Sequence, residues 1–260
     1  MSPRAILSER GWAKFPATPD TLRWAEAAHD VADRILQDAE HQKTWLQCEG
    51  TWFVGVDVLP SDAAGALHGV PLRGPAVDAL PAGQDLHPAQ LSVIYPGYPK
   101  PRQGESDAAF RFREKRYAAH VDGILADGPK RRRFLREPHA IILGIALNDV
   151  PPEAGPLVVW SHSQVVMRGV FQQAFRGVPD DEWSDIDVTE VYTQARKSVF
   201  ETCTPQTIPM QRGEMVLVHR LALHGIAPWR DTGRPWPSGR RIAYFRPQLT
   251  GGVADWISAD

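Results

Sequence analysis

Three side chains of the sequence have the types and the spacing of a metal site. His120 and Asp122 form the only His-x-Asp of the chain, and His224 follows an apolar run and precedes a glycine. In an extended segment residues i and i+2 point to the same side, so His120 and Asp122 can reach one ion. Two histidines and a carboxylate on one side of an ion are the ligands of non-haem Fe(II) sites, which keep other positions open. We therefore predict a metal-dependent catalytic centre at His120, Asp122 and His224.

The overall composition excludes several other kinds of protein. The chain has 260 residues and a formal net charge of -2, so no global attraction to nucleic acid or to an anionic membrane is expected. Its two cysteines, Cys48 and Cys203, exclude a disulfide framework. No apolar stretch reaches the ~18 residues of a membrane span, and the N-terminus lacks the apolar segment of a signal peptide. We expect a cytoplasmic protein without nucleic-acid or membrane partners, and its oligomeric state is left open.

The pattern along the chain predicts a mainly β protein with helical additions. Capping residues at 18–20 and apolar residues at three- and four-residue spacing up to Ala39 predict an amphipathic helix that covers the face of a sheet. Runs rich in β-branched and aromatic residues predict strands, at 51–58, 90–95, 140–147, 155–160 and on both sides of a loop in 213–246. Short strands separated by proline and glycine favour a jelly roll.

The same pattern suggests one domain over residues 1–260. It comprises a helical N-terminal region, residues 1–48, and a core barrel from about 50 to 250. Residues 165–200 carry scattered aromatic side chains and read as a helical insertion, of the kind that commonly forms a lid over a site.

A known family shares several of these motifs. Gly213-Glu214, Val216 to His219, Leu223-His224-Gly225, the later Arg-x-Ala strand, His120-Val121-Asp122-Gly123 and the strands within 142–160 resemble the phytanoyl-CoA dioxygenase-like branch of Fe(II)/2-oxoglutarate oxygenases. The resemblance runs with gaps from residue 90 to residue 247. It implies a double-stranded β-helix (cupin-like jelly roll), with Fe(II) held by His120, Asp122 and His224, while His219 has a packing role. It also implies that 2-oxoglutarate and dioxygen are co-substrates, and that a small molecule is hydroxylated with release of succinate and CO2.

The resemblance further implies an arginine for the distal carboxylate of 2-oxoglutarate at the start of the last core strand. Arg240 and Arg241 both stand there, after a long connection from Trp229 to Gly239. The Arg-x-Ala register favours Arg241, and Arg240 is the alternative. Neighbouring strand residues point to opposite faces, so only one of the two can enter the barrel.

The substrate and the reaction class stay open at this stage. Basic segments at 102–116 and 130–136 are compatible with an anionic group on the substrate, although solvated surface for 102–116 and an exposed turn for 130–136 are the simpler interpretations. Aromatic residues of the insertion favour an apolar body, so an acyl-CoA, an amino-acid derivative and a natural-product intermediate fit equally. The same ligands also serve Zn or Mn hydrolases and isomerases. A non-catalytic binding barrel, in which the three residues meet by coincidence, is the third option.

Overall fold

The computed structural model describes residues 2–80, 84–230 and 233–258. Its helices are α1 (Pro3–Arg10), α2 (Pro19–Gln37), α3 (Ala39–Trp45), α4 (Pro75–Asp78), α5 (Asp107–Lys115), α6 (Ser163–Ala174), the 3-10 helix η1 (Asp180–Asp185), α7 (Thr189–Thr202) and α8 (Gly252–Ser258). Its strands are β1 (Trp12–Phe15), β2 (Leu46–Gln47), β3 (Trp52–Leu59), β4 (Ala89–Ile94), β5 (Ile124–Asp127), β6 (Arg132–Leu135), β7 (Ile141–Ala146), β8 (Leu157–Trp160), β9 (Pro205–Ile208), β10 (Met215–His219), β11 (His224–Ile226) and β12 (Arg240–Phe245).

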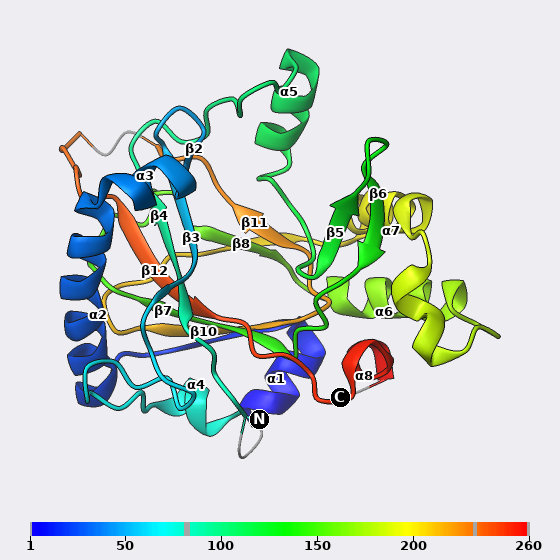
Figure 1. The fold of residues 1–260 in the computed structure, drawn as a ribbon, viewed down its shortest axis with the longest axis horizontal. Helices are drawn as coiled ribbons and strands as arrows, with labels where there is room; N and C mark the ends of the chain where they lie inside the picture. The colour runs from blue at the N-terminus through cyan, green and yellow to red at the C-terminus, as the bar shows by residue number, and fades with distance from the viewer. Residues whose placement is uncertain (1, 81–83, 231–232, 259–260) are drawn as a thin grey trace.

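Two antiparallel sheets face each other and form the core (Figure 1). The large sheet has the order β1-β10-β7-β12-β4-β3-β2, and the small sheet has the order β11-β8-β9. Apolar side chains from both sheets meet between them in one buried cluster, which includes Ile142, Val216 and Ile242 from the large sheet and Leu157 and Val159 from the small one. The strands predicted at 51–58, 90–95, 140–147 and 155–160 are confirmed as β3, β4, β7 and β8. The predicted jelly roll is confirmed.

Helix α2 covers the outer face of the large sheet, as the sequence predicts. Thr18 caps the helix and forms a capping box with Thr21. The face of α2 that carries Trp24 and several alanines is fully buried, and the Trp24 ring lies 5.7 Å from the ring of Phe245 on β12. Small and aromatic residues along one stripe thus let the helix lie close to the sheet.

The alternation along β12 separates its side chains between two environments. Ala243 and Phe245 pack in the outer cluster with α2, while Ile242 and Tyr244 pack in the cluster between the sheets. Because side chains alternate along a strand, Arg240 belongs to the inner face and Arg241 to the outer face. Hydrogen bonding to β4 on one side and β7 on the other fixes this register.

Two regions of the fold differ from the sequence-based prediction. The N-terminal region, residues 1–48, is not only helical, because β1 pairs with β10 and forms an edge of the large sheet. The basic segment at 130–136 is not only an exposed turn, because β6 pairs with β5 in a hairpin whose facing residues Ile124 and Leu135 are buried. Both elements have four residues, too few for a clear periodic signal.

The helical insertion at 165–200 is confirmed as α6, η1 and α7. It packs beside the β5-β6 hairpin, where the Val188 amide donates to the Arg133 carbonyl at 2.9 Å and the Arg133 amide donates to Thr189 Oγ1 at 2.7 Å. The insertion therefore forms a side wall next to the barrel (Figure 1). In the described residues of the chain, no helix is both long enough and apolar enough to cross a membrane.

Candidate functional site

The fold brings His120, Asp122 and His224 together. One ligand atom from each lies within 4.8 Å of the others, a spacing that can hold a metal ion. Asp122 Oδ1 is 3.1 Å from His120 Nε2 and 3.7 Å from His224 Nε2. His224 is buried at the start of β11, whereas the His120 side chain is 47% exposed. The cluster is thus open on the His120 side and closed on the His224 side.

The backbone around His120 is held by its partners across the barrel. His120 and His224 form a single antiparallel bridge, with amide-to-carbonyl distances of 2.8 and 3.0 Å, where the sequence suggests a strand. The Val121 amide donates to the Tyr192 hydroxyl of α7 at 2.8 Å. The insertion therefore helps to position the loop that carries two of the three candidate ligands.

The two glycines that follow candidate ligands are explained by close backbone contacts. A Cβ atom at Gly225 would lie 2.1 Å from the Tyr117 carbonyl oxygen, which accepts a hydrogen bond from the Ile226 amide. Gly123 has φ +84°, and a Cβ there would lie 2.0 Å from the Glu137 carbonyl oxygen. Both positions exclude a side chain, which accounts for glycine after Asp122 and after His224.

Hydrogen bonds orient both imidazoles with Nε2 towards Asp122. Nδ1 of His120 is 3.0 Å from the Ala118 carbonyl, and Nδ1 of His224 is 2.9 Å from the Ala222 carbonyl. A carbonyl only accepts, so each Nδ1 carries the hydrogen and each Nε2 is left for another partner. A second ring nitrogen fixed in this way is the usual arrangement of metal-binding histidines.

The charge states of the cluster also suit a cation. Burial lowers the pKa of His224 to about 4, with His120 adding to the effect, so its imidazole is neutral at neutral pH. Burial opposes ionisation of Asp122, but the nearby imidazoles of His120 and His224 and the Arg246 guanidinium hold its pKa well below the usual range. Neutral imidazole and ionised carboxylate are the forms that bind metal ions.

An inner chamber of about 150 Å³ lies between the sheets, with His120, Asp122 and His224 in its lining. Most of its surface is apolar, from Ile142, Leu157, Val218 and Ile226 among others. Polar groups come from Gln90, Ser92, Tyr244 and Arg246.

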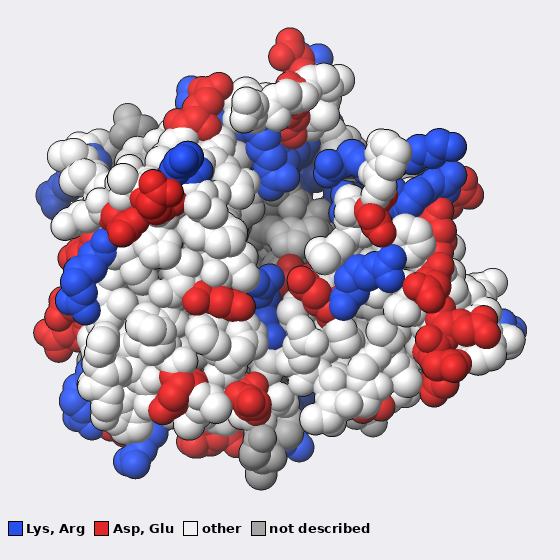
Figure 2. Space-filling view, viewed as in Figure 1, with Lys and Arg blue, Asp and Glu red and all other residues white. Residues whose placement is uncertain are grey.

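An outer chamber of about 390 Å³ shares Trp52, His120, Asp122 and Arg246 with the inner one. Five further arginines line it, from the segments around α5, β6 and α7: Arg102, Arg113, Arg116, Arg133 and Arg196. Figure 2 shows the surface hollowed near its centre, with basic side chains along the rim. The candidate metal ligands therefore lie where a small apolar chamber meets a larger basic one.

The structure does not bring Arg241 to this site. Arg241 Nη1 lies 2.6 Å from Asp33 Oδ1 of α2, and Arg241 Nε donates to the Ser238 carbonyl at 3.1 Å. The side chain is on the outer face of the large sheet, away from the space between the sheets. This placement conflicts with the assignment of the 2-oxoglutarate carboxylate to Arg241, because Ala243 of the Arg-x-Ala pattern faces α2 and Arg241 faces with it.

The neighbouring Arg240 is on the inner face and is 4% exposed. Among the described residues, its Nε and Nη2 atoms are buried without a hydrogen-bond partner. Arg240 pairs with Ile94 across the sheet, and Ile94 belongs to the same buried cluster as Ile226, two residues beyond His224. A buried guanidinium with unpaired N–H groups is costly, and an anion can satisfy it.

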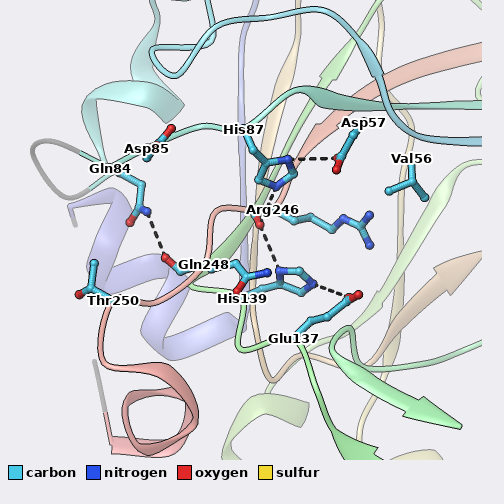
Figure 3. Close-up of a pocket in the computed structure, with 10 residues that line it drawn as sticks. All are labelled: Val56, Asp57, Gln84, Asp85, His87, Glu137, His139, Arg246, Gln248 and Thr250. Carbon is cyan, nitrogen blue, oxygen red and sulfur yellow. Dashed lines mark hydrogen bonds and ion pairs between the residues drawn. The ribbon is translucent and has the colours of Figure 1, made fainter. Parts of the chain in front are cut away.

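The sequence-based reasoning missed Arg246, which follows β12. Its Nη1 is 3.8 Å from Asp122 Oδ2, and its carbonyl accepts hydrogen bonds from His87 Nε2 at 2.9 Å and His139 Nδ1 at 3.1 Å. Figure 3 shows this arrangement at a hollow of about 640 Å³, with the guanidinium extending away from both imidazoles. The two-residue alternation from Arg240 through Ile242 is the signal that places Arg246 on the inner face.

His219 and His162 are both outside the cluster. Burial lowers the pKa of His219 to about 3; its Nδ1 accepts from the Leu221 amide at 3.0 Å, and its Nε2 is 3.3 Å from Arg168 Nη2. The prediction that His219 packs rather than binds metal agrees with these contacts. His162 is exposed, with Nδ1 2.8 Å from the Glu9 carbonyl, as expected of a surface loop residue.

Comparison with known proteins identifies the architecture. No family model and no curated protein sequence matches the chain. Among solved structures, it is similar to the non-haem alpha-ketoglutarate-dependent carbocyclase SnoK from nogalamycin biosynthesis, at 15% identity and a TM-score of 0.53, over 96% of this chain and 87% of that one. It is also similar to EctD from S. alaskensis with 2-oxoglutarate and 5-hydroxyectoine, at 16% identity and a TM-score of 0.51, over 97% and 77% of the two chains. The chain shares their fold. At this identity the likeness concerns architecture, and the chemistry has to be argued from the site.

Proposed function

We propose that this protein is an Fe(II)- and 2-oxoglutarate-dependent oxygenase that hydroxylates a small molecule, with release of succinate and CO2. The observation that carries the proposal is the cluster of two histidines and one carboxylate between a small barrel chamber and a larger open one. His120, Asp122 and His224 would hold the metal from one side. When bound, the ferrous ion with 2-oxoglutarate and dioxygen supplies the oxidising chemistry.

Arg240 is the residue that we assign to 2-oxoglutarate. Its guanidinium is buried on the inner face of β12, with Nε and Nη2 unpartnered among the described residues. A guanidinium presents fixed donors that match a carboxylate. A dicarboxylate in the inner chamber would place one end at the candidate metal ligands and the other towards Arg240. The apolar wall would keep water from the reacting atoms.

Arg246 has a supporting role in this proposal. Its guanidinium faces Asp122 at 3.8 Å and favours the ionised carboxylate that a metal requires. The hydrogen bonds from His87 and His139 to its carbonyl fix the backbone from which the side chain extends. Arg246 therefore positions and stabilises a candidate ligand.

The test is succinate formation by protein reconstituted with Fe(II). Slow conversion of 2-oxoglutarate to succinate in air, without added substrate, is expected for wild type and should be lost in His224→Ala and Asp122→Ala. The exposed His162→Ala variant should keep it, as a matched histidine control. Metal binding without succinate would indicate a Zn or Mn hydrolase or isomerase with the same ligands. Unchanged metal content in both site variants would indicate a non-catalytic barrel.

A further inference from the structure

The outer chamber collects arginines from segments that are far apart in the sequence. Arg102 follows β4, Arg116 follows α5, Arg133 lies on β6 and Arg196 lies on α7, and all four line the chamber that contains His120 and Asp122. Figure 2 shows basic side chains on more than one side of the central hollow. The fold, rather than one basic run, produces this concentration of positive charge.

Few acidic side chains balance these arginines. Arg113 is paired with Glu105 through two contacts of 2.8 Å. In the described ranges, the other four arginines form no ion pair with a carboxylate. Three of the four lie against aromatic rings instead: Arg102 over Trp52, Arg116 over Phe200, and Arg196 over Tyr192 and Phe200. Stacking holds the guanidinium planes in place and leaves their edges free to donate hydrogen bonds.

Three of the arginines show that this arrangement is energetically unfavourable without a ligand. Burial lowers the pKa of Arg133, and the like charges of Arg131 and Arg196 lower it further. Arg196 Nε and Arg113 Nη1 are buried and have no hydrogen-bond partner among the described residues. Like charges held together in a partly buried chamber, with unsatisfied donors, form a site that an anion would complete.

We propose, resting on the proposed function, that the outer chamber binds a phosphate or diphosphate ester of the oxygenase substrate beside the metal site. One carboxylate is satisfied by one bidentate arginine, whereas a phosphate ester carries up to two charges and three terminal oxygens that accept from several guanidinium groups. Four arginines without acidic partners match the second kind of group. The apolar side chain of Phe112, 56% exposed on the chamber wall, offers a surface for the rest of the substrate.

The test is calorimetric titration of inorganic pyrophosphate into the metal-free protein, so that it needs neither iron nor turnover. Pyrophosphate is expected to bind wild type, and Arg133→Gln, Arg196→Gln and Arg116→Gln should each weaken binding about 10-fold or more. Arg111→Gln is the matched control, because Arg111 is exposed on the same helix as Arg113 and does not line the chamber; it should change affinity less than about 2-fold. Melting temperatures of the three variants show whether each one folds, and affinities are compared only among variants that melt like wild type.

Three results would overturn the proposal: no pyrophosphate binding to wild type, equal weakening by Arg111→Gln and the chamber variants, or tighter binding of citrate than of pyrophosphate. Pyrophosphate binding combined with no succinate formation would retain the anion site and reject the oxygenase. Succinate formation without pyrophosphate binding would retain the oxygenase and reject the phosphate ester.

Discussion

The two faces of β12 place the neighbouring Arg240 and Arg241 in opposite environments. On the outer face, Arg241 is paired with Asp33, so the fold itself satisfies the guanidinium. On the inner face, Arg240 is buried and two of its nitrogens lack a partner among the described residues. Buried charges are normally paired within a protein, so a buried arginine with two nitrogens unpaired among the described residues is a candidate for binding an anion. We therefore expect the outer arginine to contribute to stability and the inner one to bind the co-substrate.

The largest expected effect follows from removing the inner arginine. Arg240→Met should raise the 2-oxoglutarate concentration needed for half-maximal succinate formation about 100-fold, because a buried carboxylate would lose the guanidinium that we assign to it. Methionine keeps much of the apolar volume. The dependence of the initial rate on 2-oxoglutarate measures the change, and a shift below about 3-fold would contradict the assignment.

The two arginines should also differ in their effect on stability. Arg241→Met should lower the free energy of unfolding by about 1–3 kcal/mol, because it removes hydrogen bonds to Asp33 and the Ser238 carbonyl. Arg240→Met should leave the free energy of unfolding unchanged or raise it, because it removes an unpaired buried charge. Urea unfolding of the metal-free proteins provides the comparison. A larger loss in Arg240→Met than in Arg241→Met would mean that Arg240 has a structural partner.

A smaller effect on stability is expected from changing Asp33, the carboxylate partner of Arg241. Asp33→Asn should lower the free energy of unfolding by about 1 kcal/mol or less, because the Asp33 side chain is 45% exposed and stays solvated. Its 2-oxoglutarate requirement should equal that of wild type. A changed 2-oxoglutarate requirement would show that the ion pair between Asp33 and Arg241 influences the inner chamber through β12.

A separate effect is a pH dependence of stability that involves His219, at the end of β10. Burial holds the folded-state pKa of His219 at about 3, below its value in the unfolded chain, so the unfolded state binds the additional proton between about pH 6.5 and 3. Stability should therefore fall as the pH falls through this range, by up to about 1.4 kcal/mol per pH unit from this group. His219→Gln should have a shallower slope in urea unfolding between about pH 7 and 5. Equal slopes would assign the effect to other histidines such as His224.

Features that depend on neighbouring residues in the sequence could be predicted from it. The cap at Thr18 and the apolar stripe to Ile35 predict α2, and the His-x-Asp spacing with the His224-Gly225 pair predicts the cluster that the structure brings together. The choice between Arg240 and Arg241 could not be made from neighbouring residues. It depends on which face of β12 lies against α2, and Ala243 is small enough for either face.

The arginine-rich lining of the outer chamber could not be predicted from local sequence patterns either. Arg102, Arg116, Arg133 and Arg196 converge only because the β5-β6 hairpin and α7 pack beside the loop of His120. The segments 102–116 and 130–136 are visible in the sequence as charge, but charge runs usually lie in solvent. Long-range packing decides which of their arginines face a cavity.

The most direct test of the account is an anaerobic absorption titration of the metal-free protein with Fe(II) and then 2-oxoglutarate. A visible metal-to-ligand charge-transfer band should develop in wild type and at a similar 2-oxoglutarate concentration in Arg241→Met. It should be absent from His224→Ala and require about 100-fold more 2-oxoglutarate in Arg240→Met. No band in wild type, or a band that Arg240→Met leaves unchanged and Arg241→Met abolishes, would contradict the account.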